Sequence, residues 1–360
     1  MRSSIALLAG LCALTPAAFA SAPAAAGVEV GGFVDVYYAL NTNRPDDGTS
    51  FLPGTGTSGK RGNDVSLNLA ALELRRPAGP FGMHLLLGLG DADAVVHAGE
   101  RALTPEEHNV FRGVQRASVS FAPAPIPGLL LEAGIFPSHV GFEAFTSRDN
   151  WTYTRGWMGE FSPYYQTGVR AQWTSPWLLR AQLHLLNGWQ VIRDNNRGKT
   201  VGAQLALEGE RFTLALNTLV GPELPDDTRH FRYFGDVVVQ LRPLRWLAVV
   251  AMADLGYQER PGLAGDALWH AFAGYARVEL SPEAALTLRG ERFADPDAGI
   301  TGAAQTLNAG TLTLDVRPAS QVSVKLEARY DRSTAAVFSA RGARLAREQL
   351  LLVSGVVVGF

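Results

Sequence analysis

The sequence predicts an all-β fold: a transmembrane, antiparallel, up-and-down β-barrel of about sixteen strands. Three observations predict it. Extended runs of alternating apolar and polar residues repeat from Val28 to Phe360, and they are joined alternately by short turns and long polar loops. The last run also ends on its apolar face in an aromatic residue, Phe360, preceded on that face by Val358 and Val356. A period of two puts side chains on opposite faces of a strand, and a membrane barrel needs that alternation between lipid and lumen.

The first twenty residues are expected to be a signal peptide. Arg2 precedes an apolar run from Ile5 to Leu14, and the small-residue site Ala18-Phe19-Ala20 follows. This order is typical of a Sec-type export signal. We therefore expect a signal over residues 1–20, a short linker over 21–27, and one barrel domain over 28–360, located in the cell outer membrane.

Composition argues against several other classes of protein. The chain carries 32 Lys and Arg against 34 Asp and Glu, and loss of Arg2 with the signal brings the net charge from −2 to about −3, which argues against nucleic acid as a partner. The single cysteine, Cys12, lies in the expected signal, so the mature chain has no thiol for disulfides, metal or catalysis. No apolar run outside the signal reaches the ~18 residues of a transmembrane helix. No cofactor is expected.

The connections follow one scheme along the chain. Short periplasmic turns are predicted at 77–80, 122–128, 175–176, 208–210, 242–244, 281–283 and 317–320. Long extracellular loops are predicted at 41–63, 91–110, 137–166, 187–199, 221–230, 256–267, 294–306 and 332–348. The strand count is then even, with both ends of the chain on the short-turn side, as in bacterial single-chain barrels.

Two other classes share parts of this pattern. A soluble periplasmic or secreted all-β binding protein has the same periodicity with its apolar face inward, and periodicity alone cannot say which face is inside. The terminal aromatic and the alternation of short and long connections favour the barrel. A barrel enzyme is the third class, but the chain has no HExxH or GxSxG motif and its seven histidines lack metal spacing.

A glycine-rich segment, Gly54-Thr55-Gly56-Thr57-Ser58-Gly59-Lys60, matches most of a phosphate-binding loop. Arg61 replaces the required Ser or Thr, and no parallel strand–helix unit follows. We therefore expect a flexible surface loop here.

Several segments, taken in order, resemble the OmpL-like β-barrel porins of Gram-negative outer membranes. They include Gly32-Phe33-Val34-Asp35-Val36-Tyr37-Tyr38, Asn43-Arg44-Pro45, Leu67-Asn68, Ala133-Gly134-Ile135-Phe136, Gly141-Phe142-Glu143, Thr167-Gly168-Val169-Arg170, Asn187-Gly188-Trp189, Asp194-Asn195-Asn196, Gly198-Lys199-Thr200 and Gly221-Pro222-Glu223. The resemblance implies an outer-membrane pore and says little about its substrate. Val358 departs from it, since terminal barrel strands often carry an aromatic residue there.

The expected function is a passive aqueous channel for small hydrophilic solutes, with no chemical step. By analogy with other porin-like barrels, the third long loop, 137–166, is expected to fold inward and narrow the lumen. The alternative is a surface loop whose aromatic residues cover the barrel mouth. Its charged residues are the constriction candidates: Glu143, Arg148, Asp149, Arg155 and Glu160. Charges on the predicted inward faces of the strands are lumen-wall candidates: Asp35, Glu73, Arg116, Glu132, Arg170, Arg180, Asp236, Arg277, Arg289, Glu291, Lys325, Glu327 and Arg329.

The expected partners are those of an outer-membrane protein. Phe360 is a candidate assembly signal for the barrel-assembly machinery, because it ends the apolar stripe of the last strand. Four arginines of the last long loop are candidates for binding lipopolysaccharide phosphates, with a solvated loop as the alternative: Arg332, Arg341, Arg344 and Arg347. Trp177, Trp246 and Trp269 are expected in aromatic girdles at the membrane interfaces. The sequence leaves the oligomeric state open.

Overall fold

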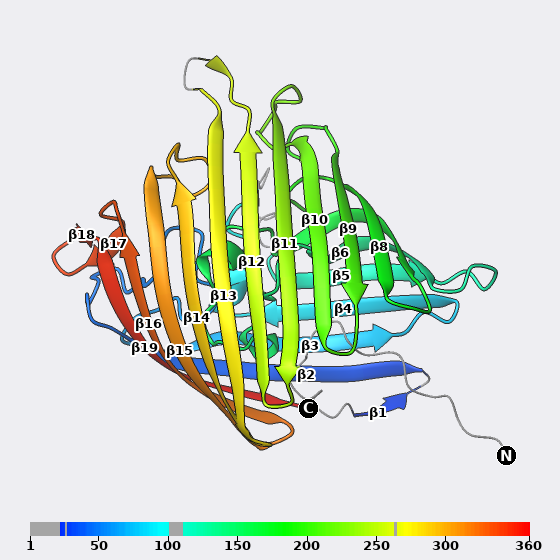
Figure 1. The fold of residues 1–360 in the computed structure, drawn as a ribbon, viewed down its shortest axis with the longest axis horizontal. Coiled ribbons are helices and arrows are strands. Elements are labelled where there is room, and N and C mark those ends of the chain that lie inside the picture. The colour runs from blue at the N-terminus through cyan, green and yellow to red at the C-terminus, as the bar shows by residue number, and fades with distance from the viewer. Residues whose placement is uncertain (1–21, 26, 101–110, 263–264) are drawn as a thin grey trace.

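Sixteen antiparallel strands close into one barrel in a computed structural model of the chain, which describes residues 22–25, 27–100, 111–262 and 265–360 (Figure 1). The expected signal peptide lies outside the described residues. The barrel strands are β2 (Val28–Asn41), β3 (Val65–Arg76), β4 (Phe81–Leu89), β5 (Val114–Phe121), β6 (Leu129–Pro137), β7 (Tyr165–Thr174), β8 (Leu179–Leu186), β9 (Thr200–Glu208), β10 (Phe212–Pro222), β11 (Phe231–Leu244), β12 (Leu247–Gln258), β13 (Ala267–Ser281), β14 (Ala284–Asp295), β15 (Gln305–Ala319), β16 (Val322–Ser333) and β19 (Glu348–Gly359).

Each barrel strand pairs with its neighbours in sequence, and β19 closes the ring by pairing with β2, where Val356 lies opposite Val36. Strands β2–β4 at the back cross β10–β13 at the front (Figure 1). Such crossing is expected when barrel strands tilt by about 35–45° from the axis. Within residues 21–27, expected to be a linker, Ala22–Ala25 form a short strand, β1, that pairs with the start of β2.

The inward and outward faces settle the question that periodicity left open. On β16, the side chains of Lys325, Glu327 and Arg329 point inward and are buried, whereas Leu326 between them is 49% exposed on the outer surface. A soluble sandwich would bury the leucine and expose the charges. The apolar face is therefore outside, as in a membrane barrel. The predicted fold is confirmed.

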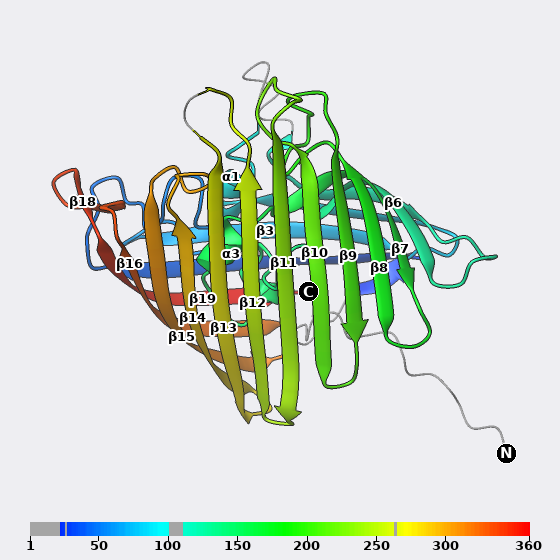
Figure 2. The same cartoon turned by 45° about the horizontal axis from the view of Figure 1, so that its top comes forward.

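The alternation of short and long connections is also confirmed. The long loops of β10–β13 gather at one end of the barrel and their short turns at the other (Figure 2). Two predicted turns are displaced, because Pro243 and Pro318 lie within β11 and β15, next to register shifts between Leu241 and Leu244 and between Val316 and Ala319. A bulge leaves one residue without a partner in the strand pairing, so a proline, which has no backbone N–H to donate, is tolerated there. The hairpin then closes beyond the proline.

The remaining elements are short and belong to the long loops. They are α1 (Asp91–Val96), η1 (Ser147–Asp149), α3 (Trp157–Glu160) and the hairpin of β17 (Phe338–Ala340) and β18 (Arg344–Ala346). None of the helices in the described part of the chain is long and apolar enough to cross a membrane.

Two of the three tryptophans expected at the membrane interfaces, Trp177 and Trp246, are exposed beside short turns. The expectation is wrong for Trp269, which is buried on the inward face of β13. Its neighbour across the strands is Gly256, and a Cβ atom there would lie 2.0 Å from the indole ring. The glycine thus leaves the space that the inward tryptophan fills.

Candidate functional site

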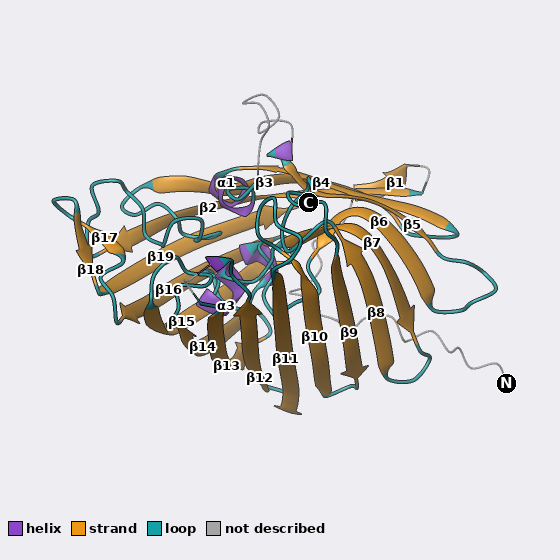
Figure 3. Ribbon diagram, turned by 90° about the horizontal axis from the view of Figure 1, so that it is seen from above, coloured by secondary structure: helices purple, strands orange, loops and turns teal. Residues whose placement is uncertain are grey.

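The third long loop enters the barrel. We call residues 138–164, between β6 and β7, the inward loop. Figure 3 shows α3 and the chain around it inside the ring of strands. Tyr153 and Trp157 of this loop are fully buried and pack in one apolar cluster with Phe51, Phe293 and Phe338. The loop is therefore part of the interior of the barrel and does not lie across its outer surface.

Two charged residues of β16 hold the middle of the inward loop. The Glu327 carboxylate accepts hydrogen bonds from the backbone N–H groups of Tyr153 (2.6 Å) and Thr154 (3.0 Å). The Lys325 ammonium donates to the carbonyl oxygens of Ser147 (2.6 Å) and Asn150 (2.5 Å). A loop without regular structure leaves its backbone polar groups unpaired, and these two wall charges satisfy four of them.

The neighbouring strand β14 adds a second pair of anchors. Arg289 donates from Nη1 to the carboxylate of Glu143 (2.9 Å) and to the carbonyl oxygen of Thr154 (2.7 Å). Glu291 accepts from the backbone N–H of Trp157 (2.6 Å), at the start of α3. Glu143 also accepts from the backbone N–H of Gly156 (2.7 Å). Here a constriction candidate, Glu143, is bound to the wall.

The upper end of β16 fixes the helix α3. Arg329 donates to the carbonyl oxygen of Arg155 (2.6 Å), and its guanidinium lies over the Trp157 ring (4.8 Å to the centroid). Asp331 pairs with Arg329 (2.9 Å) and accepts from the indole nitrogen of Trp157 (2.8 Å). Sequence reasoning missed Asp331, which it placed at the edge of the last loop. One more step of the alternation through Lys325, Glu327 and Arg329 would have found it.

The first barrel strand contributes Asp35. Its carboxylate accepts from the hydroxyl groups of Ser147 (2.6 Å) and Tyr153 (2.8 Å) and from the amide of Asn68 (2.7 Å). Asp35 thus binds the same part of the loop as Lys325, since both are bonded to Ser147. We call the inward faces of β2 and β14–β16 the sealed wall, because the loop covers their charges: Asp35, Arg289, Glu291, Lys325, Glu327, Arg329 and Asp331, all at most 8% exposed.

The glycine-rich segment holds a carboxylate of the inward loop. Glu160 accepts from the backbone N–H groups of Gly56 (2.7 Å) and Thr57 (3.1 Å) and from the Thr57 hydroxyl (2.8 Å). The expectation of a flexible surface loop is wrong here, since Thr55, Thr57 and Ser58 are buried. The segment does present its amides to an anion, but that anion is a side chain of the same protein.

Two acidic residues face the inward loop from β11 and β12. Asp236 and Asp254 lie opposite each other in the strand register and are buried. Asp236 accepts from the backbone N–H of Gly141 (3.1 Å) and from the amide of Asn217. No ion pair to either carboxylate occurs among the described residues. Two carboxylates this close repel each other when both are charged, so keeping the doubly charged pair together costs free energy.

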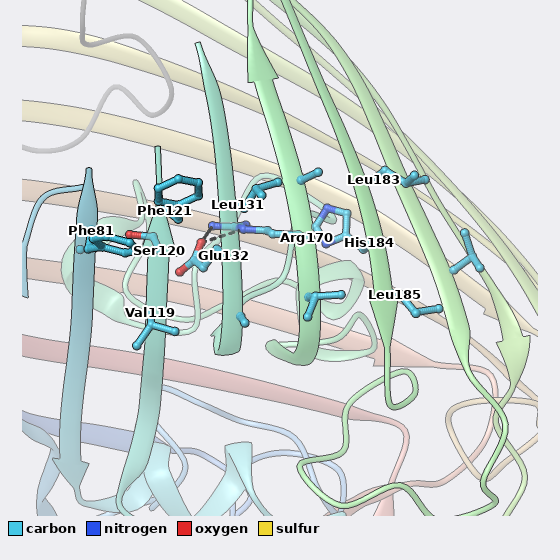
Figure 4. A pocket seen from close by; sticks show the side chains of 15 residues that line it. Phe81, Val119, Ser120, Phe121, Leu131, Glu132, Arg170, Leu183, His184 and Leu185 are labelled. Atoms are coloured by element: carbon cyan, nitrogen blue, oxygen red, sulfur yellow. Dashed lines mark hydrogen bonds and ion pairs between the residues drawn. The ribbon is translucent and has the colours of Figure 1, made fainter. Parts of the chain in front are cut away.

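The opposite side of the lumen, the inward faces of β4–β8, keeps its arginines partly exposed, and we call it the open wall. Glu132 on β6 accepts from Arg116 of β5 (2.7 Å) and from Arg170 of β7 (2.5 Å). Figure 4 shows Glu132 and Arg170 linked, with His184 beside them on the next strand. Further along, Arg180 pairs with Glu208 (2.7 Å). The arginines of this wall are partly exposed, and none of the bonds named here ties them to the inward loop.

A hollow of about 850 Å³ lies along the same strands and is lined mainly by their outward apolar residues, among them Val119, Leu131 and Leu183 (Figure 4). These side chains alternate with the inward charges. The hollow therefore belongs to the lipid-facing surface of the barrel.

A cavity of about 310 Å³ lies between part of the inward loop and strands β3–β5, whereas His139 of the loop stacks on His184 of β8. Glu73 of β3, His84 of β4 and Arg116 of β5 line it on one side, and Arg148, Asp149 and Arg155 of the loop line it on the other. Glu73 and His84 are hydrogen-bonded to each other (2.7 Å). Six residues predicted from the sequence as constriction or wall candidates thus line this cavity: Glu73, Arg116, Glu143, Arg148, Asp149 and Arg155.

The other candidates lie elsewhere. Arg277 of β13 pairs with Glu279 (2.9 Å) and with Asp315 (3.3 Å), away from the inward loop. Arg155 is buried, with its guanidinium over the Tyr164 ring (4.7 Å), whereas Arg148 and Asp149 are partly exposed. Of the constriction candidates, Glu160 holds the loop, Glu143 both holds the loop and borders the cavity, and Arg148, Asp149 and Arg155 line the cavity.

Burial shifts the titration of several loop groups. It raises the pKa of the Tyr153 hydroxyl well above its ordinary value, and the Asp35 carboxylate adds to that shift. It lowers the pKa of His139 to about 4, so this imidazole is neutral near pH 7. In α1, burial raises the pKa of Asp93 to about 6, although Arg112 and a hydrogen bond from Gln115 oppose the shift.

The C-terminal residue sits on the first barrel strand. The backbone N–H of Phe360 donates to the carbonyl oxygen of Gly32 (3.0 Å), and the Gly32 N–H donates in return (3.4 Å). A Cβ atom on Gly32 would lie 2.7 Å from the Phe360 ring. Glycine is required there so that the terminal ring can cover the seam between β19 and β2.

The family described as "Putative beta-barrel porin-2, OmpL-like" matches residues 27–360. The chain belongs to this family. It is an outer-membrane β-barrel porin, and the resemblance seen in the sequence is confirmed. No curated protein sequence matches the chain closely enough to show a relative.

Solved structures with the same fold are also porins or outer-membrane channels. The anion-selective porin of Comamonas acidovorans has a TM-score of 0.61 at 10% identity, over 92% of this chain and 99% of that one. The DcaP channel of Acinetobacter baumannii gives 0.61 at 12% identity, over 95% and 100%. Salmonella typhi OmpF, solved with daunomycin, gives 0.62 at 11% identity, over 92% and 97%. At such low identities these structures show the fold alone.

Family and fold together point to a channel without a chemical step. Within the described residues, no group of three or more His, Cys, Asp and Glu side chains is placed to hold a metal ion.

Proposed function

We propose that the protein is a passive channel for small hydrophilic solutes, and that solutes pass between the inward loop and the open wall. The observation that carries this proposal is the unequal burial of the lumen charges. Charges of the sealed wall are covered by the loop, whereas Arg116, Arg148 and Asp149 border the cavity of about 310 Å³. A passage lined by fixed charges of both signs filters permeants by width and by charge.

Recording in planar bilayers tests this proposal. Purified protein that shows heat-modifiable migration in gels should produce stepwise conductance that is ohmic at low voltage. Uptake of small sugars into proteoliposomes should decline with solute size. Folded protein that conducts no ions would contradict the channel.

We also propose three contacts of the mature protein. Phe360 serves as an assembly signal read by the barrel-assembly machinery, supported by its seat on Gly32 at the closing seam. The outward apolar face contacts outer-membrane lipid. Lipopolysaccharide phosphates bind at the last long loop, where Arg341 and Arg344 are exposed.

Deletion of Phe360 tests the first of these contacts. The deletion should lower the amount of folded protein in the outer membrane and increase its degradation in the periplasm. Normal surface levels of the deletion variant would count against it.

A further inference from the structure

The cavity between the inward loop and the open wall offers a solute more free hydrogen-bond donors than free acceptors. Its carboxylates are already engaged. Glu73 is bonded to His84 (2.7 Å), Asp149 accepts from the Thr146 hydroxyl (2.5 Å) and from Arg148 (3.1 Å), and Glu143 is bonded to Arg289 of the sealed wall. Little acceptor capacity remains for a solute that brings hydrogen-bond donors.

One cation of the cavity, Arg155, retains hydrogen-bond donors without an acceptor. Arg155 is only 2% exposed, and its Nε and Nη1 groups have no hydrogen-bond acceptor in the protein. Its Nη2 group donates to the carbonyl oxygen of Glu143 (3.1 Å), a neutral partner. No direct ion pair joins Arg155 to a carboxylate among the described residues, so its charge is balanced only at longer range, by neighbours such as Glu143.

The open wall adds positive charge at the same level. Arg116 and Arg170 share one carboxylate, that of Glu132, so this triad carries a net charge of plus one. Both Glu132 oxygens are already bonded: one to Arg116 and to the Ser118 hydroxyl (2.6 Å), and the other to Arg170. The carboxylate is buried at 3% side-chain exposure while the Arg116 side chain is 20% exposed, so the positive partner faces the lumen.

We infer that the cavity is a binding site for small oxyanions, solutes that carry a carboxylate or a phosphate group, with Arg116, Arg148 and Arg155 as its cationic groups. The inference rests on the proposed channel and assigns its substrate class. Guanidinium groups match the geometry of carboxylate and phosphate oxygens. The cavity of about 310 Å³ equals about ten water volumes of ~30 Å³, which suits a solute with few non-hydrogen atoms.

The test uses the whole protein in planar bilayers, with succinate and inorganic phosphate as probes. In a gradient of potassium chloride, the wild type should favour chloride over potassium. Millimolar succinate or phosphate should reduce the chloride current in a saturable way, because a bound oxyanion occupies the narrow part of the path. A block by one probe alone identifies that probe's group as the preferred one and supports the site.

The double variant Arg116→Gln, Arg148→Gln should lose this behaviour. We expect the chloride preference to fall and the half-blocking concentration to rise by about fivefold or more, since a unit charge within about 4 Å of an ion contributes roughly that much even in water-like surroundings. Arg116→Lys keeps the charge but loses the planar fork, so it should keep the chloride preference and weaken the block. Arg292→Gln removes an exposed, outward charge of β14 and is the matched control that should change neither.

The outcomes separate the two proposals. A folded protein without conductance overturns the channel and this inference together. A conducting wild type that favours potassium, or whose current is unaffected by both probes, overturns the oxyanion site and leaves the channel standing. Equal effects of Arg292→Gln and of the double variant would also overturn the site.

Discussion

Strands β16 and β7 are built on the same alternation, but their inward charges have different surroundings. Lys325, Glu327 and Arg329 of β16 are covered by the inward loop, at most 4% exposed, and they bond to its backbone. Arg170 of β7 bonds to a neighbour on the wall and keeps contact with the lumen. A charged residue on an inward face can therefore hold a loop or line a path. The chemistry of the residue does not decide which; the position of the loop does.

The largest effect is expected from removing the loop that makes the two walls different. Deleting residues 145–157 removes Tyr153 and Trp157 and uncovers the sealed wall, while the strands still close through Phe136 and Thr167. Single-channel conductance should rise several-fold, because the narrowest section dominates the resistance of a water-filled pore. Folding of the variant is checked by heat-modifiable migration. Wild-type conductance in folded protein would place the loop outside the conducting path.

The second prediction compares how much one charged residue of each wall contributes to the free energy of unfolding. Lys325→Met leaves the buried carbonyl oxygens of Ser147 and Asn150 without a donor and removes the cation beside Asp35. Breaking such a buried network costs about 3 kcal/mol. Arg180→Gln on the open wall, where the pair is partly solvated, should cost less than about 1 kcal/mol. Urea unfolding in lipid vesicles measures both, and equal losses would remove the distinction between the walls.

A gain of stability is expected when one carboxylate of the buried pair Asp236 and Asp254 is removed. Asp254→Asn removes one of two buried carboxylates that face each other without a counter-charge and keeps the shape of the side chain. Relief of like-charge repulsion should stabilise the barrel by about 1 kcal/mol near pH 7.5. Asp227→Asn, in an exposed loop turn, is the control. A clear loss of stability in Asp254→Asn would show that both charges are needed.

The smallest effect concerns pH and the α1 segment. Burial raises the pKa of Asp93 to about 6, above its value of about 4 in an unfolded chain, so the folded state binds the proton more tightly. The stabilisation is complete below about pH 4 and is lost as the pH rises through about 6. Hydrogen exchange of α1, corrected for intrinsic rates, should be faster at pH 7.5 than at pH 5. Asp93→Asn should remove that difference, and a persistent difference would assign it to another group.

Much of the fold could be predicted from the sequence because a strand in a barrel repeats a local rule. Alternation, turn residues and the terminal Phe360 gave the strands, the closure and the even count. The turns predicted at Pro243 and Pro318 are displaced, because a bulge depends on how two strands pair and cannot be predicted from one strand alone.

The site was harder to predict, because burial of a lumen charge depends on where a distant loop lies. Glu327 and Glu132 both follow the inward alternation, yet Glu327 bonds to residues about 170 positions away in sequence, such as Tyr153. No local pattern distinguishes them. The glycine-rich segment was misjudged for the same reason, since its partner, Glu160, lies over 100 residues away.

Cysteine accessibility tests the central claim, that water and solutes pass along the open wall and not the sealed one. Cys12 is the one cysteine of the chain and lies in the expected signal, so a single introduced thiol in the mature protein is the only target. Ser120→Cys on β5 and Thr313→Cys on β15 are near-isosteric changes on the inward faces of the two walls. During bilayer recording, a small charged methanethiosulfonate reagent should modify Ser120→Cys and change its current in steps, while Thr313→Cys should stay unmodified at its wild-type current. Rapid modification of Thr313→Cys with no reaction at Ser120→Cys would contradict the account.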